Sequence, residues 1–220
     1  KGIHIFCTNK YLKRVLKNEI KIDFCGVIHT TPEILDDFKG DEEITKKYKD
    51  MRCFAVNTID YELAKFLVNN FKEVYWATAV IDPTYLANVT CLLSRLVNMP
   101  ECSTQGNVGA TMVLLAKAMG YNPISLLGFS MGHHPLKTWT MHESFECKYY
   151  YHPKLDYIIC QDPPFEIYLL HLINWIQAVQ KEGMMIINCT NFSMLRFRED
   201  IVPYMHITEF IKKVNGDKNA

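Results

Sequence analysis

Short apolar runs alternate along the chain with segments in which apolar residues recur every three or four positions. The runs predict β-strands, and the recurring positions predict helices that bury one face. The expected strands cover residues 3–7, 23–29, 52–57, 73–81, 123–129 and 184–189. The expected helices cover residues 11–19, 60–71, 83–97, 105–119, 163–183 and 208–214, with a further helix start at Thr31-Pro32-Glu33.

This alternation is typical of a mostly parallel sheet whose two faces are covered by helices. We therefore predict an α/β fold, a Rossmann-like three-layer sandwich, forming a single domain over residues 1–220. A polar and aromatic segment at about 131–162 interrupts the pattern, and we expect an irregular, lid-like loop there. The charged stretch from Asp36 to Asp50 predicts a solvated helix and loop.

Composition excludes several classes of protein. Lys+Arg and Asp+Glu are equal at 24 each, which argues against a nucleic-acid clamp or a polybasic membrane patch. No apolar run reaches the roughly 18 residues of a membrane span. The eight Cys form no C-x-x-C pair and lie mostly in apolar runs, as small buried residues do in a reducing compartment. We therefore expect a cytoplasmic protein.

Candidate ligand-binding residues follow the expected strands, because open α/β sheets bind ligands at the carboxyl ends of their strands. These residues are Asn9, His29, Thr30, Asn57, Asp82, Gly128 and Ser130. Short neutral side chains suit hydrogen bonds to a ribose, a base or a phosphate, and they do not suggest a pair of carboxylates for acid–base chemistry. The alternative is that they only cap helices and turns.

A second candidate is the loop that opens the helix at 105–119. Its small and hydroxyl-bearing residues are Ser103, Thr104, Gln105, Gly106 and Asn107. Such a loop exposes backbone N–H groups at the positive end of a helix dipole, which favours phosphate. The segment is neither a P-loop nor a G-x-G-x-x-G fingerprint. Close packing of the helix is the alternative explanation.

The segment at 131–162 carries four His and one Cys, namely His133, His134, His142, His152 and Cys147. Their spacing matches no compact zinc module, so we assign no metal ligands. We expect a lid over the ligand, whose His and Tyr residues are candidates for a general base and for hydrogen bonds to phosphate. The spacing does not select one His among them.

Three segments resemble the MptE-like family. Gln-Gly-Asn-Val-Gly-Ala-Thr at 105–111, followed by the apolar strand ending at Gly128, resembles its core signature. Ile-Lys-Ile-Asp-Phe at 20–24 and Ile-Asn-Cys-Thr at 187–190 resemble two further stretches. The family's archaeal members are 6-hydroxymethyl-7,8-dihydropterin diphosphokinases, bacterial relatives are associated with flagellin glycosylation, and the bacterial sialyltransferase fold is a more distant relative.

The resemblance implies a nucleotide-binding transferase that moves diphosphate from ATP, with Mg²⁺, to a hydroxymethylpterin-type acceptor. It implies that Asn9, Asn57 and residues 103–107 hold ATP or another nucleotide, together with Gly128 and Ser130. On the acceptor side it implies His133 or His134, with His29, Thr30 and Asp82. A glycosyltransferase using a sugar nucleotide and a non-catalytic nucleotide-binding or interaction module are the alternatives. A homo-oligomer is left open.

The sequence also departs from the family pattern. Gln105 replaces a glycine, and Ser130 stands where the family usually has Asp. The family's opening G-x-G-P-S turn does not precede Lys1, so the chain resembles a member cut downstream of that turn.

Overall fold

The computed structural model describes residues 2–29, 31–80, 96–103, 107–135 and 147–216. The chain divides into two compact units, Lys1–Met119 and Gly120–Ala220, and each is described by itself. The single domain expected over residues 1–220 stays a prediction. No helix among the described residues combines the length and the apolarity needed to cross a membrane.

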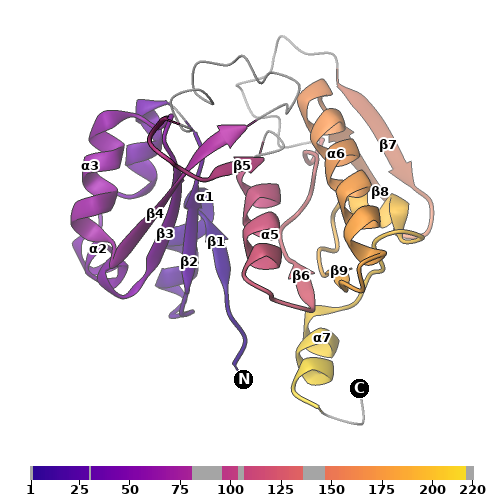
Figure 1. The fold of residues 1–220 in the computed structure, drawn as a ribbon. Helices are drawn as coiled ribbons and strands as arrows, with labels where there is room; N and C mark the ends of the chain where they lie inside the picture. The colour runs from indigo at the N-terminus through magenta and orange to yellow at the C-terminus, as the bar shows by residue number, and fades with distance from the viewer. Residues whose placement is uncertain (1, 30, 81–95, 104–106, 136–146, 217–220) are drawn as a thin grey trace. The chain divides into compact units, whose positions relative to one another are not determined.

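The first unit is built on a parallel sheet (Figure 1), with strand order β1-β2-β3-β4-β5. All four strand pairs are parallel. The strands are β1 (Phe6–Thr8), β2 (Phe24–Val27), β3 (Arg52–Val56), β4 (Glu73–Val80) and β5 (Glu101–Ser103). The short β5 was not predicted. The α/β, Rossmann-like prediction is confirmed.

Helices cover both faces of this sheet. They are α1 (Asn9–Lys17), η1 (Pro32–Asp37), α2 (Glu42–Lys47), η2 (Tyr48–Asp50), α3 (Tyr61–Asn70) and α5 (Val108–Ala118). α1 contacts β1 and β2, and its Leu12 and Leu16 share a core cluster with Cys25. α5 also contacts β1 and β2, and it packs on Gly26. Since successive strand residues point to opposite faces, α1 and α5 lie on opposite sides of β2. Of the helix predicted at 83–97, residues 83–95 lie outside the described residues.

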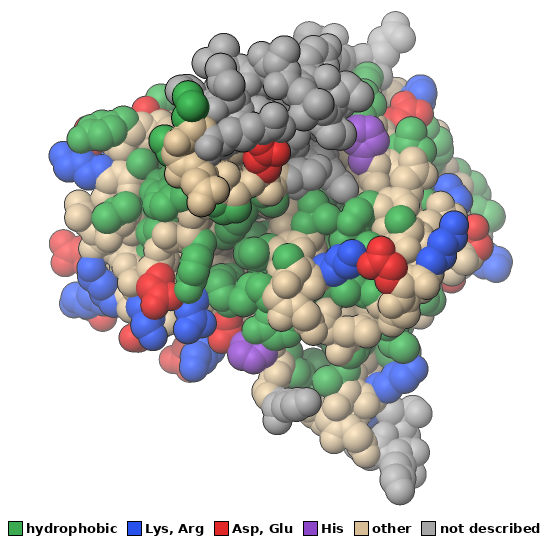
Figure 2. Space-filling model, in the orientation of Figure 1, with side chains coloured by type: hydrophobic (Ala, Val, Ile, Leu, Met, Phe, Trp, Pro, Cys, Tyr) green, Lys and Arg blue, Asp and Glu red, His purple; other side chains and the backbone are tan. Residues whose placement is uncertain are grey.

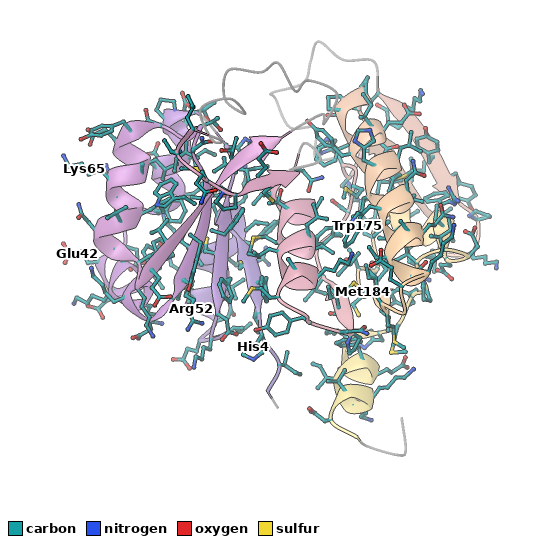
Figure 3. The ribbon with its side chains drawn as sticks, viewed as in Figure 1. His4, Glu42, Arg52, Lys65, Trp175 and Met184 are labelled. Atoms are coloured by element: carbon teal, nitrogen blue, oxygen red, sulfur yellow. The ribbon has the colours of Figure 1, made fainter. Side chains whose placement is uncertain are left out.

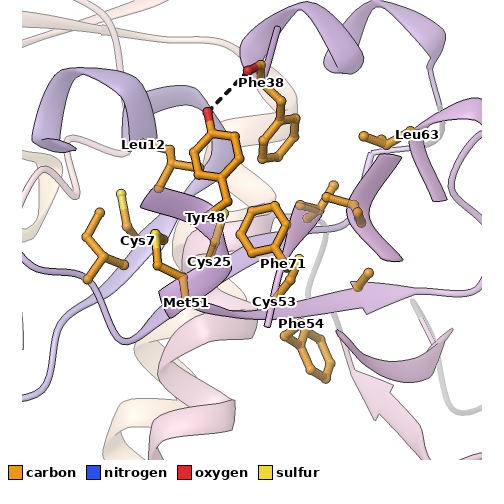
Figure 4. Close-up of a cluster of buried hydrophobic side chains, with 14 of the residues drawn as sticks. Cys7, Leu12, Cys25, Phe38, Tyr48, Met51, Cys53, Phe54, Leu63 and Phe71 are labelled. Atoms are coloured by element: carbon orange, nitrogen blue, oxygen red, sulfur yellow. Dashed lines mark hydrogen bonds between the residues drawn. The ribbon is translucent and has the colours of Figure 1, made fainter. Parts of the chain in front are cut away.

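The charged segment at 36–50 contains the expected helix, but it also contributes core residues, so the prediction of a solvated segment was wrong. Phe38, Ile44 and Tyr48 are 0%, 4% and 0% exposed. Figure 4 shows the Tyr48 hydroxyl donating a hydrogen bond to the Phe38 carbonyl, at 3.2 Å. The Tyr48 ring stacks on Phe71, with centroids 5.0 Å apart. Because the charged residues around them face water, the apolar positions are hidden in the composition of this stretch.

Three cysteines form a row across the core of the first unit. Cys7 pairs in register with Cys25, and Cys25 with Cys53. All three are buried and free, as expected for small apolar residues. Burial raises the pKa of the Cys7 thiol to about 11 and that of Cys25 well above its ordinary value.

The second unit combines a short parallel pair with a hairpin. β6 (Ile124–Leu126) pairs with β9 (Ile186–Asn188), and the antiparallel β7 (Lys148–His152) and β8 (Tyr157–Gln161) form the hairpin. The helices are α6 (Pro163–Gln180), η4 (Met194–Arg198) and α7 (Ile207–Val214). The prediction of irregular structure at 131–162 is therefore wrong for the residues that form β7 and β8. Residues 136–146 lie outside the described residues, and a lid role stays a prediction.

Candidate functional site

The two ends of the sheet in the first unit differ in chemistry. Ion pairs gather at the amino ends of the strands, where Arg52 Nε lies 3.2 Å from Glu73 Oε2 and His4 Nδ1 lies 3.3 Å from Asp23 Oδ1. Figure 3 labels Arg52 and His4 at this end of the unit, and on the face drawn in Figure 2 charges of both signs are intermixed over this unit. The carboxyl end instead carries the neutral polar residues of the sequence analysis.

Several predicted site residues follow strands of this one sheet. They are Asn9 after β1, His29 after β2, Asn57 after β3, Ser103 at the end of β5 and Asn107 at the start of α5. The parallel arrangement therefore brings them to one edge. Thr30, Asp82, Thr104, Gln105 and Gly106 lie outside the described residues.

Gly26 lets the start of α5 lie close to the carboxyl end of β2. A Cβ on Gly26 would lie 3.2 Å from Val108 Cγ2 and 2.2 Å from Met112 Sδ, so only a glycine lets α5 approach this closely. Gly26 is paired in register with Thr8, and α1 begins at the next residue, Asn9. The starts of both helices therefore lie beside the carboxyl ends of β1 and β2.

Asn107 is the N-cap of α5. Its Oδ1 accepts a hydrogen bond from the Ala110 N–H at 2.8 Å, while its Nδ2, a donor, is buried without a partner. The first turn of α5 contains no acidic residue. Since the first N–H groups of a helix lack intrahelical acceptors, this start carries donors besides the Ala110 N–H that Asn107 Oδ1 binds.

Asn9 also has a buried side-chain atom without a partner, but this atom is an acceptor rather than a donor. The residue is 3% exposed, and its Nδ2 donates to Asp37 Oδ2 at 2.6 Å. Its Oδ1, an acceptor, is buried without a partner. Asp37 is held in place because Lys13 Nζ donates to the carbonyl of Asp36, at 2.7 Å, and to that of Lys39.

Buried polar atoms without partners are uncommon and call for an explanation. Asn9 Oδ1 and Asn107 Nδ2 are two such atoms among the described residues. The start of α5 suits an anion. Asn9 Oδ1 suits a hydroxyl or amine donor instead, because an amide oxygen only accepts hydrogen bonds.

Asn57 and His29 lie at the surface, in contrast to Asn9. Both are exposed, and Asn57 Nδ2 donates to Thr78 Oγ1 at 3.2 Å, which ties the end of β3 to β4. This contact fits the alternative that such residues stabilise turns.

Gly128 and Ser130 follow β6 in the second unit. Gly128 has a φ of 79°, and the Ser130 carbonyl accepts from the Met194 N–H at 2.8 Å. Thr190 Oγ1 also accepts from the Phe129 N–H at 3.1 Å. The described contacts of this turn join it to the loop after β9.

His133 and His134 have different surroundings. His133 Nε2 lies 3.3 Å from Asp162 Oδ2, and the Asp162 side chain is 1% exposed. His134 is exposed and packs on Phe192, with ring centroids 5.5 Å apart. Asp162 and Asp37 were not predicted from the sequence. Asp162 had a signal, since an Asp directly before Pro163-Pro164 is typical of a helix N-cap.

Comparison with known proteins finds a similarity of fold. Neither a family model nor a curated protein matches the chain. Among solved structures, the chain is similar to the MAf glycosyltransferase from Magnetospirillum magneticum AMB-1, with a TM-score of 0.61 and 12% sequence identity. The match covers 94% of this chain and 30% of that chain, so the chain spans about a third of the length of its neighbour. At this identity the likeness concerns the fold alone, and membership of the MptE-like family stays a prediction.

Proposed function

We propose that this chain is the nucleotide-binding part of a transferase that takes its donor group from a sugar nucleotide. The observation that carries the proposal is the pair of buried, unpartnered amide atoms, Asn9 Oδ1 and Asn107 Nδ2, at the carboxyl edge of a parallel sheet. This edge is where open α/β sheets bind ligands. The similarity in fold to a glycosyltransferase supports the choice of donor.

Each residue has a separate role in the proposal. The first N–H groups of α5 and Asn107 Nδ2 bind the phosphates of the nucleotide. Asn9 Oδ1 accepts a hydrogen bond from a ribose hydroxyl or from an amine on the base. Fixed donors of this kind also stabilise the negative charge that grows on the departing nucleotide, which is how such sites accelerate group transfer.

The second candidate is a diphosphokinase that uses ATP and Mg²⁺ with a hydroxymethylpterin-type acceptor. The resemblance of residues 105–111 and 123–128 to the MptE-like signature favours it. The described residues hold no group of three His, Cys, Asp or Glu side chains suited to a metal. In this candidate Mg²⁺ binds in part through the phosphates and water, as it often does beside nucleotides.

Thermal-shift and calorimetric binding of CMP, UDP, GDP, ADP, ATP and the matching sugar nucleotides tests the proposal. The informative variant is Asn107→Asp, because Asp is as good an N-cap as Asn but replaces the Nδ2 donor with a negative oxygen. Asn107→Ser is the matched control, since it keeps the cap and removes the Nδ2 donor without adding a charge, so we expect it to bind between wild type and Asn107→Asp. We expect wild type to be stabilised by about 2.7 kcal/mol at a ligand concentration 100 times Kd.

Three outcomes are distinguishable. Loss of binding in Asn107→Asp, with an unchanged melting temperature without ligand and with weakened but measurable binding by Asn107→Ser, supports the site. Equal binding by all three proteins contradicts it. Mass spectrometry of products then separates transfer of a sugar from transfer of diphosphate, and tight binding without any product identifies a non-catalytic module.

A further inference from the structure

Two cysteine side chains are in contact at the end of the β7–β8 hairpin that lies opposite its turn. The register pairs Tyr149 of β7 with Cys160 of β8. Directly opposite residues point to the same face of a hairpin, and so does every second residue along a strand. Cys147 and Cys160 therefore share a face, one diagonal step apart. A hydrogen bond joins their thiols, and both cysteines are free.

Cys160 is the fixed and buried member of this pair. Its N–H donates to the His133 carbonyl at 2.9 Å, and its carbonyl accepts from the His133 N–H at 2.6 Å. Since Tyr149 pairs with it on the other side, the backbone at Cys160 is held from both directions. The residue is 5% exposed. Burial, together with the neighbouring Cys147 thiol, raises the pKa of the Cys160 thiol to about 11.

Cys147 is the accessible member of the pair. It is partly exposed and stands directly before Lys148, the first residue of β7. A disulfide requires Cβ atoms about 3.5–4.5 Å apart, which is somewhat closer than diagonal neighbours usually are. Because Cys147 lies outside the ladder of β7 and β8, it can close this difference without separating the two strands.

We propose that Cys147 and Cys160 form a redox-active pair, which a low-molecular-weight disulfide oxidises to an intramolecular disulfide that ties the start of β7 to β8. The inference concerns the second unit alone and does not depend on the proposed transferase function. Cys147 is the attacking residue, since it is the one that a dissolved oxidant reaches. Cys160 is the resolving residue, since it is already in contact with the Cys147 sulfur.

The reaction consists of two thiol–disulfide exchanges. The Cys147 thiol loses its proton, and its sulfur attacks one sulfur of the oxidant, whose S–S bond breaks. The departing thiolate takes up a proton and leaves as a thiol. The Cys160 sulfur, after losing its own proton, then attacks the Cys147 sulfur of the mixed disulfide and releases the second thiol. The two cysteines together lose two electrons, and the oxidant gains them.

A cysteine pair in the first unit shows that contact between thiols is not sufficient. Cys25 and Cys53 are paired in register between β2 and β3, and a hydrogen bond joins their thiols as well. Both are 0% exposed and lie among the buried side chains of the core cluster (Figure 4). A dissolved oxidant therefore reaches neither thiol. This pair is the internal control for the experiment.

Oxidation of the folded full chain with oxidised glutathione, followed by peptide mapping, tests the proposal. The remaining thiols are alkylated in denaturant, and the protein is digested with trypsin. Cleavage after Lys148 and Lys154 places Cys147 in peptide 138–148 and Cys160 in peptide 155–181. A disulfide between the two cysteines is therefore observed directly as a linked pair of peptides in mass spectrometry.

We expect this linked pair to be the main oxidised product and to disappear on treatment with dithiothreitol. Cys25 and Cys53 are expected to stay reduced and to be alkylated in full. In amide hydrogen exchange, oxidation of wild type should slow exchange in β7 by about tenfold or more, because the new bond opposes separation of the strands.

Three variants assign the roles of the two cysteines. Cys160→Ala removes the resolving thiol, so Cys147 is expected to accumulate as a mixed disulfide with glutathione. Cys147→Ser removes the attacking thiol, so Cys160 is expected to stay reduced and exchange in β7 to stay unchanged. Cys102→Ser is the matched control, because Cys102 is also partly exposed but lies on β5 of the first unit. It is expected to oxidise as wild type does.

Several results would overturn the proposal. They are absence of the linked peptides from oxidised wild type, their formation only in denaturant, and a mixed disulfide that persists at Cys147 in wild type. Linkage of Cys147 or Cys160 mainly to another cysteine contradicts the pairing in the same way. Unchanged exchange in β7 after the linked pair has formed contradicts the tie between the strands. An unmodified Cys147 in Cys160→Ala refutes its role as the attacking residue.

Discussion

Gly26 and Met112 are in such close contact that a Cβ on Gly26 would lie 2.2 Å from the Met112 sulfur. Gly26→Ala therefore forces the Met112 side chain to move within a packed interface. We expect a loss of about 1–3 kcal/mol in the free energy of unfolding, measured by urea denaturation. The double variant Gly26→Ala/Met112→Ala has room for the new methyl group. We expect the cost of Gly26→Ala to shrink in that background, and an equal cost in both backgrounds would contradict the contact.

Tyr48 offers a second test of the core in the first unit. Tyr48→Phe keeps the ring on Phe71 but leaves the Phe38 carbonyl without its buried donor. We expect a loss of about 0.5–1.5 kcal/mol. Tyr48→Ala also removes the ring, and we expect about 3–5 kcal/mol. Denaturation curves of the two variants measure the difference, and equal losses would show that the ring contributes nothing.

Stability falls at alkaline pH in a defined window. Burial raises the pKa of Tyr48 above its ordinary value of 10.0, and burial raises the pKa of Cys7 from 9.0 to about 11. The unfolded chain therefore releases these protons first. The stabilisation is fully present below pH 9 and is lost as pH rises through the range in which only the unfolded groups ionise.

We expect the free energy of unfolding to be level between pH 7 and 8.5. Above pH 9 it declines by up to about 1.4 kcal/mol per pH unit for each group. Denaturation at a series of pH values measures this decline. Tyr48→Phe provides the control, because its curve has a shallower slope above pH 10. Identical slopes for wild type and variant would contradict the assignment to Tyr48.

Gly132 packs so closely on β8 that this position, next to His133, has no room for a side chain. A Cβ on Gly132 would lie 2.9 Å from the Cys160 carbonyl oxygen and 2.9 Å from Ile159 Cγ1. Because a backbone carbonyl cannot rotate away as a side chain does, Gly132→Ala separates His133 from β8. Hydrogen exchange measured by mass spectrometry is expected to rise in β8 and to stay unchanged in β1–β3. Unchanged exchange in β8 would refute this account.

The periodic elements were predictable because their patterns are local. β1 to β4, α1, α3, α5, α6 and β9 each have an apolar run or an apolar helical face of their own. The hairpin was missed although Tyr149, Tyr150 and Tyr151 are typical strand residues, because polar neighbours made the segment look like a loop. Phe38 and Tyr48 were missed because their burial depends on contacts with α3 and Phe71.

The candidate sites were predictable only in part. The position of Asn9 after a strand and of Asn107 at a helix start follows from local pattern. The polar atoms that they leave without a partner do not follow from local pattern. The orientation of the Asn9 amide depends on its hydrogen bond to Asp37, 28 residues later in the chain. The same holds for Asp162, whose contact with His133 spans 29 residues. Such pairs are set by tertiary packing, which spacing along one sequence does not reveal.

The strand order of the first unit has a consequence during synthesis. Since β1 to β5 are neighbours in chain order, each strand can pair with its predecessor as soon as the ribosome releases it. α5 comes after all five strands, yet it is the helix that packs on Gly26 of β2. The nascent sheet therefore keeps the α5-facing side of β2 exposed until residue 118 has emerged, which is an interval suited to chaperone binding.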